Sequence, residues 1–280
     1  MPNLLQWYPG HMTKARRELS ALLPSQDVLI EVLDARLPDS SSNPLLRELR
    51  GKKPCVKVLA KSDLADPART EAWLQQLRAE PNVAAFAAAK SRAAETRTRI
   101  HALCKDMALT RGPDKAVRAL VVGVPNVGKS TLINVLMERS VAAVGDKPAI
   151  TKAQQHVVMK SGMKLTDSPG IMWPKIEHEA CALRLAFAGS IPDTAVDYLS
   201  VGMFGAGLLL ADYRDLLIAR FKLSPVPASP EALLEAIGRR RGGLRPGGVV
   251  DLHKAAEVFV HEFRSGAIGR ITLDAPPRAD

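Results

Sequence analysis

The chain has 280 residues, of which 46% are hydrophobic and 24% charged, enough to bury the core of one large domain or two ordinary ones. Lysine and arginine total 39 against 29 acidic residues, and the formal net charge of +10 favours a polyanionic partner such as nucleic acid. Three scattered cysteines argue against disulfides and a cysteine zinc site, and no apolar run approaches the roughly 20 residues of a membrane span. We therefore expect a cytoplasmic protein that has no membrane partner and lacks a signal peptide.

The chain divides into three expected regions. Residues 1–25 form a leader, in which a Pro-Gly turn precedes a short helix with an apolar stripe at Leu19, Leu22 and Leu23. Residues 26–175 alternate between strands at 27–35, 54–64, 83–88 and 117–124 and helices at 67–79, 91–111 and 128–138, followed by a hairpin at 156–160 and 163–167. This alternation predicts an α/β fold with a mostly parallel, doubly wound sheet.

Residues 176–280 are expected to form a smaller all-helical domain. Its helices are predicted near 177–188, 193–199, 206–221, 230–240 and 250–264, and the segment GGLRPGG at 242–248 separates the last two. Between residues 214 and 245 there are seven Lys or Arg and three acids. Two interpretations fit such a surface: basic residues that stabilise a helix C-terminus in solvent, and a contact with RNA. Aromatic residues are scarce, so phosphate and shape contacts with structured RNA fit better than base stacking.

Residues 123–130 (GVPNVGKS) match the phosphate-loop pattern G-x-x-x-x-G-K-[ST] in full. The loop follows an apolar strand and opens a helix, as this motif requires. Its glycines allow the backbone amides to wrap phosphate oxygens, while Lys129 is expected to reach the β and γ phosphates and Ser130 to bind Mg²⁺. Downstream, Asp167 ends a strand in the sequence DSPG and suits a water-mediated Mg²⁺ ligand. Gly170 can contact the γ-phosphate, and Thr151 suits a switch threonine that completes the Mg²⁺ shell.

A base-recognition motif stands upstream of the phosphate loop. In Ala60-Lys61-Ser62-Asp63 the carboxylate can accept two hydrogen bonds that guanine offers and adenine does not, which makes an ATPase the least favoured alternative. The Lys61 stem can lie over the base and brace the phosphate loop. Ala89 begins a second base-contacting loop. The expected nucleotide contacts are Lys61, Ser62, Asp63, Ala89, Asn126, Val127, Gly128, Lys129, Ser130, Thr131, Thr151 and Gly170.

With base motifs first and phosphate motifs second, the chain resembles the circularly permuted GTPases of the YlqF/RbgA family. The segments that carry the resemblance span nearly the whole chain: WYPGHMTKARREL, EVLDARLPDSSSNP, LAKSDL, GVPNVGKSTLIN, PAITKAQQ, LTDSPGIMWPK and LRLAFAGSI. The resemblance implies a P-loop GTPase fold and a cytoplasmic GTPase that acts in late assembly of the large ribosomal subunit and contacts rRNA through its helical domain. The departure is Ala60, where the family usually has Asn.

The resemblance also bears on hydrolysis. The position after the DSPG glycine is Ile171, which cannot orient water, so intrinsic turnover should be slow and stimulated by ribosomal particles. The family's PGHM histidine, here His11, is the candidate catalytic group beside Lys129; a helix cap and an rRNA contact are its alternatives. Related GTPases with an asparagine at the position of Asn126 bind K⁺ between the phosphates.

We expect a monomer that binds GTP or GDP and a precursor of the large ribosomal subunit. The alternatives are a GTP-dependent switch that binds another protein, and a small-subunit assembly GTPase. Small-subunit GTPases of this permutation carry N-terminal barrels or cysteine-rich zinc modules as their family pattern. Only about 25 residues precede the first expected strand, and no C-x-x-C is present, so this alternative ranks below the large-subunit one.

Overall fold

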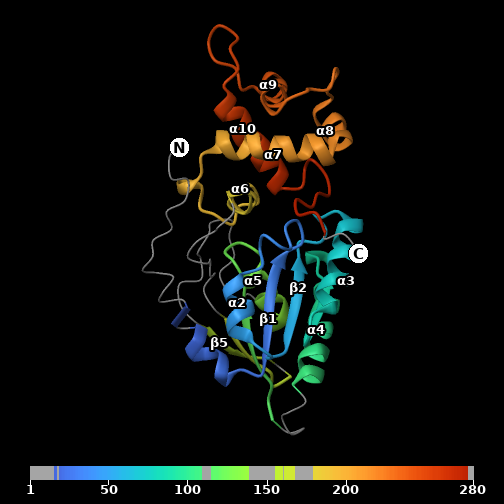
Figure 1. The fold of residues 1–280 in the computed structure, drawn as a ribbon, viewed down its shortest axis with the longest axis vertical. Helices are drawn as coiled ribbons and strands as arrows, with labels where there is room; N and C mark the ends of the chain where they lie inside the picture. The colour runs from blue at the N-terminus through green and yellow to red at the C-terminus, as the bar shows by residue number, and fades with distance from the viewer. Residues whose placement is uncertain are drawn as a thin grey trace.

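The computed structural model describes residues 16–17, 19–108, 115–138, 155–159, 161–167 and 179–276, with the backbone alone at 155–157 and 167. His11, Thr151 and Gly170 lie outside these residues. The described chain forms a sheet domain with helices on both faces, and a helical region that lies beyond the ends of the strands (Figure 1). No helix within these ranges is long and apolar enough to cross a membrane.

Among the described residues, six strands form one sheet in the order β3-β2-β1-β4-β6-β5. Its strands are β1 (Val28–Asp34), β2 (Cys55–Ala60), β3 (Val83–Ala87), β4 (Arg118–Val122), β5 (Gln155–Val158) and β6 (Lys164–Asp167). All neighbours are parallel except β5, which forms the expected antiparallel hairpin with β6. Because β1 lies between β2 and β4, the loops that follow these three strands meet at one edge of the sheet. The predicted parallel α/β sheet is thus confirmed.

Both faces of the sheet are covered, which explains why β1 is apolar apart from Glu31 and Asp34 and is buried at every position. Its even-numbered residues, such as Ile30, pack with Ile100 and Ile133 of α4 and α5, and its odd-numbered residues, such as Leu29, pack on the opposite side. Leu19 and Leu23 of the expected leader helix are buried there, so its apolar stripe serves this face. The helices of the sheet domain are α2 (Pro44–Arg50), α3 (Pro67–Ala79), α4 (Ala93–Met107) and α5 (Lys129–Met137), and two 3₁₀ turns are η1 (Leu23–Ser25) and η2 (Lys90–Arg92).

The helical region packs its helices around a cluster of aromatic rings. Phe187 stacks on Phe263 with ring centroids 4.2 Å apart and lies 5.6 Å from Phe259, and all three rings are buried. Asp197, Ser229 and Asp251 cap the starts of three helices by accepting backbone N–H groups. The elements of the region are α6 (Glu179–Phe187), the 3₁₀ turn η3 (Asp193–Ala195), α7 (Tyr198–Asp212), α8 (Arg214–Phe221), α9 (Pro230–Arg241) and α10 (Leu252–Arg264).

The chain returns to the sheet domain after α10. Leu273 N–H donates to Arg36 O (2.6 Å), and the Asp274 carboxylate accepts from the Ser40 amide (2.8 Å) and hydroxyl (2.7 Å). Trp73 of α3 donates through Nε1 to Asp274 O at 3.2 Å. The sequence-based boundary at residue 176 stays a prediction, but the segment 268–274 belongs by its contacts to the sheet domain.

Two expectations for the helices were wrong in detail, and one helix was missed. The helix expected at 193–199 is a 3₁₀ turn followed by α7, and the helix expected at 206–221 is divided at Tyr213 between α7 and α8. In α7, Gly202 and Gly205 are buried where Ala256 and Phe187 approach the helix closely. Helix α2 was missed, because seven residues are too short to display a helical period.

Candidate functional site

The loop at residues 123–128 joins β4 to α5 with a backbone that requires glycine at its ends. Gly123 has φ +149°, and a Cβ there would lie 2.4 Å from Val32 O, so only glycine fits against β1. Gly128 has φ +111° and immediately precedes α5, so no side chain caps the first amides of that helix. The loop therefore presents backbone N–H groups at a helix N-terminus, an arrangement that suits phosphate oxygens.

Two side chains of this loop make contacts that bear on the nucleotide. The Lys129 side chain is buried, and its ammonium donates to Val124 O at 2.8 Å, which holds it within the curve of the loop. Asn126 has a left-handed backbone, φ +57°, and its amide nitrogen donates to Gly189 O at 2.9 Å in the turn after α6. The phosphate loop is thus bound directly to the helical region.

The base motif lies beside the phosphate loop, as the sheet order requires. Lys61, with φ +58°, donates from Nζ to Asn126 O at 2.7 Å, so the expected brace between the two loops is present. Ser62 N–H donates to Ala88 O at 3.1 Å, which joins the first base loop to the segment that leads into Ala89. The Asp63 side chain is exposed, as a group that accepts from a base must be.

A buried ion pair stabilises the base motif through its contact with Lys61. Asp34, at the end of β1, accepts from Arg36 Nε at 2.9 Å and Nη2 at 2.8 Å, and from Lys61 Nζ at 2.8 Å. Burial alone would raise the pKa of Asp34, but the Arg36 guanidinium and the Lys61 ammonium hold it well below its ordinary value. Asp34 is therefore ionised and fixes the Lys61 ammonium beside the phosphate loop.

The returning C-terminal segment supports the same base loop from outside. Arg270 donates to Ser62 O at 3.1 Å and to Ala65 O at 2.9 Å, on either side of Asp63. Ile271 N–H donates to Leu64 O at 3.0 Å. The backbone carbonyls of Ser62, Leu64 and Ala65 are thereby satisfied, while the Asp63 side chain between them is exposed.

The structure brings the predicted base and phosphate residues together but describes only part of the magnesium side. Ser130 and Thr131 occupy the first turn of α5, next to the phosphate loop. The backbone of Asp167 ends β6, opposite Val121 of the adjacent strand β4. Sequence reasoning missed the roles of Arg36, Gly189 and Arg270. The one available signal was the charged pair Asp34 and Arg36 at the end of a mostly apolar strand.

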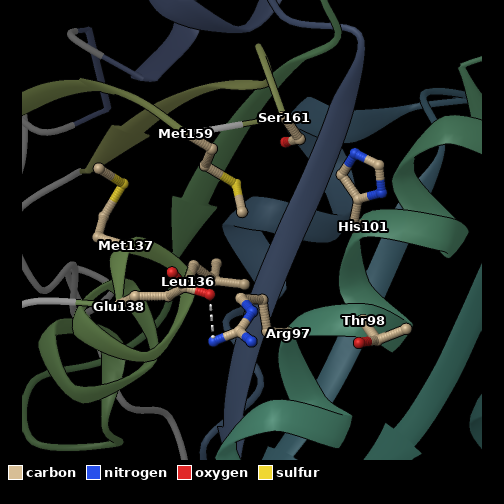
Figure 2. Close-up of a pocket in the computed structure, with 8 residues that line it drawn as sticks. All are labelled: Arg97, Thr98, His101, Leu136, Met137, Glu138, Met159 and Ser161. Carbon is tan, nitrogen blue, oxygen red and sulfur yellow. Dashed lines mark ion pairs between the residues drawn. The ribbon is translucent and has the colours of Figure 1, made fainter.

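A separate cavity of about 240 Å³ lies between α4, the end of α5 and the β5–β6 hairpin (Figure 2). Its lining residues are Arg97, Thr98, His101, Leu136, Met137, Glu138, Met159 and Ser161. An ion pair of 2.9 Å joins Arg97 to Glu138 across it. The cavity lies at the carboxyl end of α5, roughly 13 Å of helix from the phosphate loop, so it is not the nucleotide site.

The basic residues at the end of α9 are exposed, but two of them also serve the fold. Arg240 donates to Phe221 O (2.7 Å) and Lys222 O (2.8 Å), which satisfies the carboxyl end of α8, and Arg241 pairs with Glu262 at 3.1 Å. The next segment forms a glycine-rich turn in which Arg245 pairs with Asp251 at 2.9 Å. Arg240 thus caps α8 rather than its own helix, while Arg239 is exposed beside it.

A sheet of this order, with a phosphate loop after β4 and a base motif after β2, defines a P-loop GTPase domain of circularly permuted connectivity. A family model described as 50S ribosome-binding GTPase matches residues 118–200, and thus begins at β4 rather than at β1. Ribosome biogenesis GTPase A from Bacillus cereus is 39% identical over 281 residues, which cover 98% of this chain and 94% of that protein. The chain belongs to the ribosome biogenesis GTPase A family.

Solved structures agree with this family over nearly the whole fold. YlqF from T. maritima with bound GNP is 27% identical, has a TM-score of 0.67 and is matched over 95% of this chain and 100% of its own. A GDP-bound YlqF structure is 26% identical, has a TM-score of 0.68 and is matched over 93% and 99%. The likeness includes the helical region, so sheet domain and helical region together make up the family fold.

Proposed function

We propose that the protein binds and hydrolyses GTP to drive a late step in assembly of the large (50S) ribosomal subunit, and that it contacts rRNA. The observation that carries the proposal is the hydrogen bond from Lys61 to Asn126 O, which joins a base motif to a phosphate loop 65 residues further along the chain. The names of the relatives, and the description of the matching family model as a 50S ribosome-binding GTPase, support the ribosomal assignment.

In this proposal the nucleotide spans the two adjacent loops. Asp63 accepts from guanine N1–H and the 2-amino group, the Lys61 stem lies along the base, and Ser62 and Ala89 complete the base side. The phosphates lie on the amides of residues 126–131. The Lys129 ammonium, which donates to Val124 O, turns toward the β and γ phosphates when they arrive, because a phosphate oxygen is a stronger acceptor than a carbonyl.

The donor set suits Mg²⁺, which prefers oxygen ligands and retains several waters. Ser130 and Thr151 would ligate it through their hydroxyls and Asp167 through a water, while Gly170 would contact the γ-phosphate. Ser130 stands in the first turn after the phosphate loop, and the Asp167 backbone ends the strand beside β4, positions compatible with such a set. When bound, the ion neutralises charge on the β and γ phosphates.

Hydrolysis needs a group to orient water, because Ile171 cannot. We propose His11 for this role, as a neutral imidazole that positions water against the γ-phosphate; a helix cap and an rRNA contact remain its alternatives. Asn126 would ligate K⁺ between the phosphates. Its amide nitrogen donates to Gly189 O, so the oxygen of the same amide is the atom that would face a cation.

The switch follows from these assignments. GTP, through Thr151 and Gly170, orders the loops around the γ-phosphate, the ordered form binds a precursor of the large subunit, and hydrolysis releases it. The charge of +10 and exposed cations such as Arg239 support an rRNA contact through the helical region. We propose that the protein acts as a monomer in the cytoplasm.

The test is GTP turnover by the purified protein with large subunits, small subunits or neither, in KCl and in NaCl, with ATP as control. The proposal expects stimulation by large subunits alone and faster turnover in KCl. Stimulation by small subunits alone would replace the large-subunit role with a small-subunit one. No stimulation by either particle would indicate a switch that binds another protein, and equal rates in the two salts would remove the potassium site.

A further inference from the structure

The buried Asp34–Arg36 pair lies inside a larger set of contacts. On one side, Lys61 Nζ donates to the same Asp34 oxygen that Arg36 Nη2 contacts, both at 2.8 Å. Arg36 and Asp34 are 1% and 0% exposed, so water does not compete for these bonds. The Arg36 guanidinium therefore shares its carboxylate with the lysine that braces the phosphate loop.

On its other side Arg36 contacts the helical region. Nη2 donates to Ala188 O at 3.3 Å and Nη1 to Arg264 O at 3.4 Å, and these carbonyls belong to the carboxyl ends of α6 and α10. The guanidinium also lies 5.2 Å from the centroid of the Phe263 ring. Carbonyls at helix ends carry partial negative charge, so a buried cation fixes both helix ends against the end of β1.

The contacts then close on themselves. The residue after Ala188 is Gly189, whose carbonyl accepts from the Asn126 amide at 2.9 Å, and Asn126 O accepts from Lys61 Nζ at 2.7 Å. Starting from Arg36, a continuous path of contacts thus leads through the turn after α6 and the phosphate loop back to the base motif. We call the members of this path the Arg36 network: Arg36, Asp34, Lys61, Asn126, Gly189 and Ala188.

We infer that Arg36 is a positioning residue of the nucleotide site, which holds Lys61 through Asp34 and Asn126 through the turn at residues 186–190. The inference rests on the proposed contacts of Lys61 and Asn126 with the nucleotide. Because the turn belongs to the helical region, the protein's grip on guanine nucleotides depends on how the helical region is seated. Arg264 reinforces the turn by donating to Ala186 O at 2.8 Å and Phe187 O at 3.1 Å.

Arginine is required here because its planar fork donates in two directions at once. It contacts both carboxylate oxygens of Asp34 and still reaches two carbonyls, which the single ammonium of lysine cannot do. Arg36→Lys keeps the charge that compensates buried Asp34, so the fold is better preserved than in Arg36→Ala, which leaves the carboxylate with the Lys61 ammonium and the backbone N–H of residue 36. Arg36→Lys therefore keeps the charge and tests whether the placement of the guanidinium donors matters.

The experiment measures the dissociation rate and Kd of a fluorescent GDP analogue with Mg²⁺ on the full-length protein without ribosomal particles, together with thermal unfolding. Arg36→Lys is expected to raise the dissociation rate and the Kd by roughly tenfold, as the loss of charged hydrogen bonds implies. The matched control is Arg69→Lys. Arg69 also ties the sheet domain to the helical region, through Asp212 at 2.7 Å, and donates to Thr272 O at 2.8 Å, but neither nucleotide loop is among its described contacts. Its variant should bind the analogue as wild type does.

A second variant changes the part of the Arg36 network that holds Asn126. Gly189→Ala leaves Arg36 intact, but Gly189 has φ +83° and the new Cβ would lie 3.2 Å from Arg264 Nε, so it strains the turn that holds Asn126 and crowds the arginine that reinforces this turn. It should also release the analogue faster, and it keeps the inference testable if Arg36→Lys fails to fold. In the double variant the two effects should fall short of their product, because both changes act on one network.

The outcomes separate this inference from the proposed function. Wild-type protein that fails to bind the analogue would overturn both. Wild-type binding that folded Arg36→Lys and Gly189→Ala leave unchanged would overturn the inference alone. Equal losses in Arg69→Lys would also overturn it, since they would trace the effect to general loosening of the two parts.

Discussion

At the scale of single residues, the proposed selection of guanine depends on one exposed carboxylate, that of Asp63. Asp63 stands on a loop whose backbone is held by Lys61, Ser62 and Arg270, yet its own side chain is exposed. Substitution of an exposed side chain usually changes the free energy of unfolding by no more than about 0.5 kcal/mol. A change at Asp63 can therefore alter base specificity with little effect on stability.

Asp63→Asn should therefore change base preference without changing the fold. Asparagine offers one acceptor and one donor, so it cannot accept both guanine hydrogen bonds but can donate to the 2-carbonyl of xanthine. We expect the Kd for GDP to rise on the order of a hundredfold or more, and xanthosine diphosphate to bind better than GDP. Competition between the two diphosphates measures this, with the melting temperature as control. Unchanged preference for GDP would place guanine recognition elsewhere.

A second residue-scale prediction concerns the buried Glu31 on β1. Burial raises its pKa above the ordinary value of 4.5, and Lys57, 3.8 Å away, only partly offsets this because it also pairs with Glu80 at 2.8 Å. A carboxyl whose pKa is higher in the folded state contributes stability below its unfolded pKa. That stability is lost as the pH rises through the folded pKa.

Glu31→Gln should therefore gain stability relative to wild type as the pH rises from about 4.5 toward neutrality. The neutral amide carries no ionic desolvation cost, while Lys57 retains Glu80. Urea unfolding of both proteins at acid and neutral pH gives the difference. A variant that loses as much stability at neutral as at acid pH would show that the Lys57 pair outweighs burial.

At the scale of elements, the sequence predicts strands and helices where a single periodic signal dominates. The helix expected at 67–79 matches α3 residue for residue, since Asp66 and Pro67 mark its start and Leu74 and Leu77 its buried side. Helix α7 was misplaced because it is apolar on nearly all sides and its glycines resemble breakers. Packing against α6 and α10 determines where α7 begins and ends, and a local sequence pattern does not contain that information.

The glycines of α7 give a prediction with an internal control. A Cβ at Gly205 would lie 2.5 Å from the ring of buried Phe187, whereas one at Gly207 would lie 3.7 Å from Pro230. Gly205→Ala should destabilise the protein by about 1–3 kcal/mol, because the aromatic cluster must shift. Gly207→Ala should stabilise it by up to about 1 kcal/mol through helix propensity. Urea unfolding of the two variants should give opposite signs, and equal effects would refute the close packing of α6 against α7.

The site shows the same limit of local information. The phosphate loop and base motif could be predicted because each is a contiguous string whose residue types state their chemistry. The Arg36 network could not, since Arg36 and Ala188 are 152 residues apart and meet only when the helical region is in place. Lys61 belongs to both cases. The motif that contains it could be recognised in the sequence, but its bond to Asp34 could not be predicted from it.

At the scale of the whole molecule, the order of the motifs along the chain does not decide which strands are neighbours in the sheet. The three loops after β1, β2 and β4 meet because those strands are neighbours, whichever of them comes first in the chain. The helical region then lies over this edge, and its contacts converge on the phosphate loop through Gly189 and on β1 through Arg36. Nucleotide binding and the seating of the helical region should consequently depend on each other.

This architecture predicts that the sheet domain and the helical region unfold together. One continuous buried cluster contains Ile30 and Val121 of the sheet and Phe187 and Phe259 of the helical region, so neither part can open without exposing the core of the other. Calorimetry should give a single transition whose van't Hoff and calorimetric enthalpies agree. Excess Mg²⁺·GDP, at about 100 times its Kd, should stabilise the whole protein by about 2.7 kcal/mol.

Hydrogen exchange locates that stabilisation. Amides of α10, which contribute no residue to either nucleotide loop, should gain protection with GDP as much as the amides of β4, because both exchange through the same global opening. ATP at the same excess is the control and should protect neither. An early transition of the helical region that GDP leaves in place would show that the two parts are independent domains. In that case the contacts at Gly189 and Arg36 would be too weak to carry a signal from the nucleotide to the surface that we propose contacts rRNA.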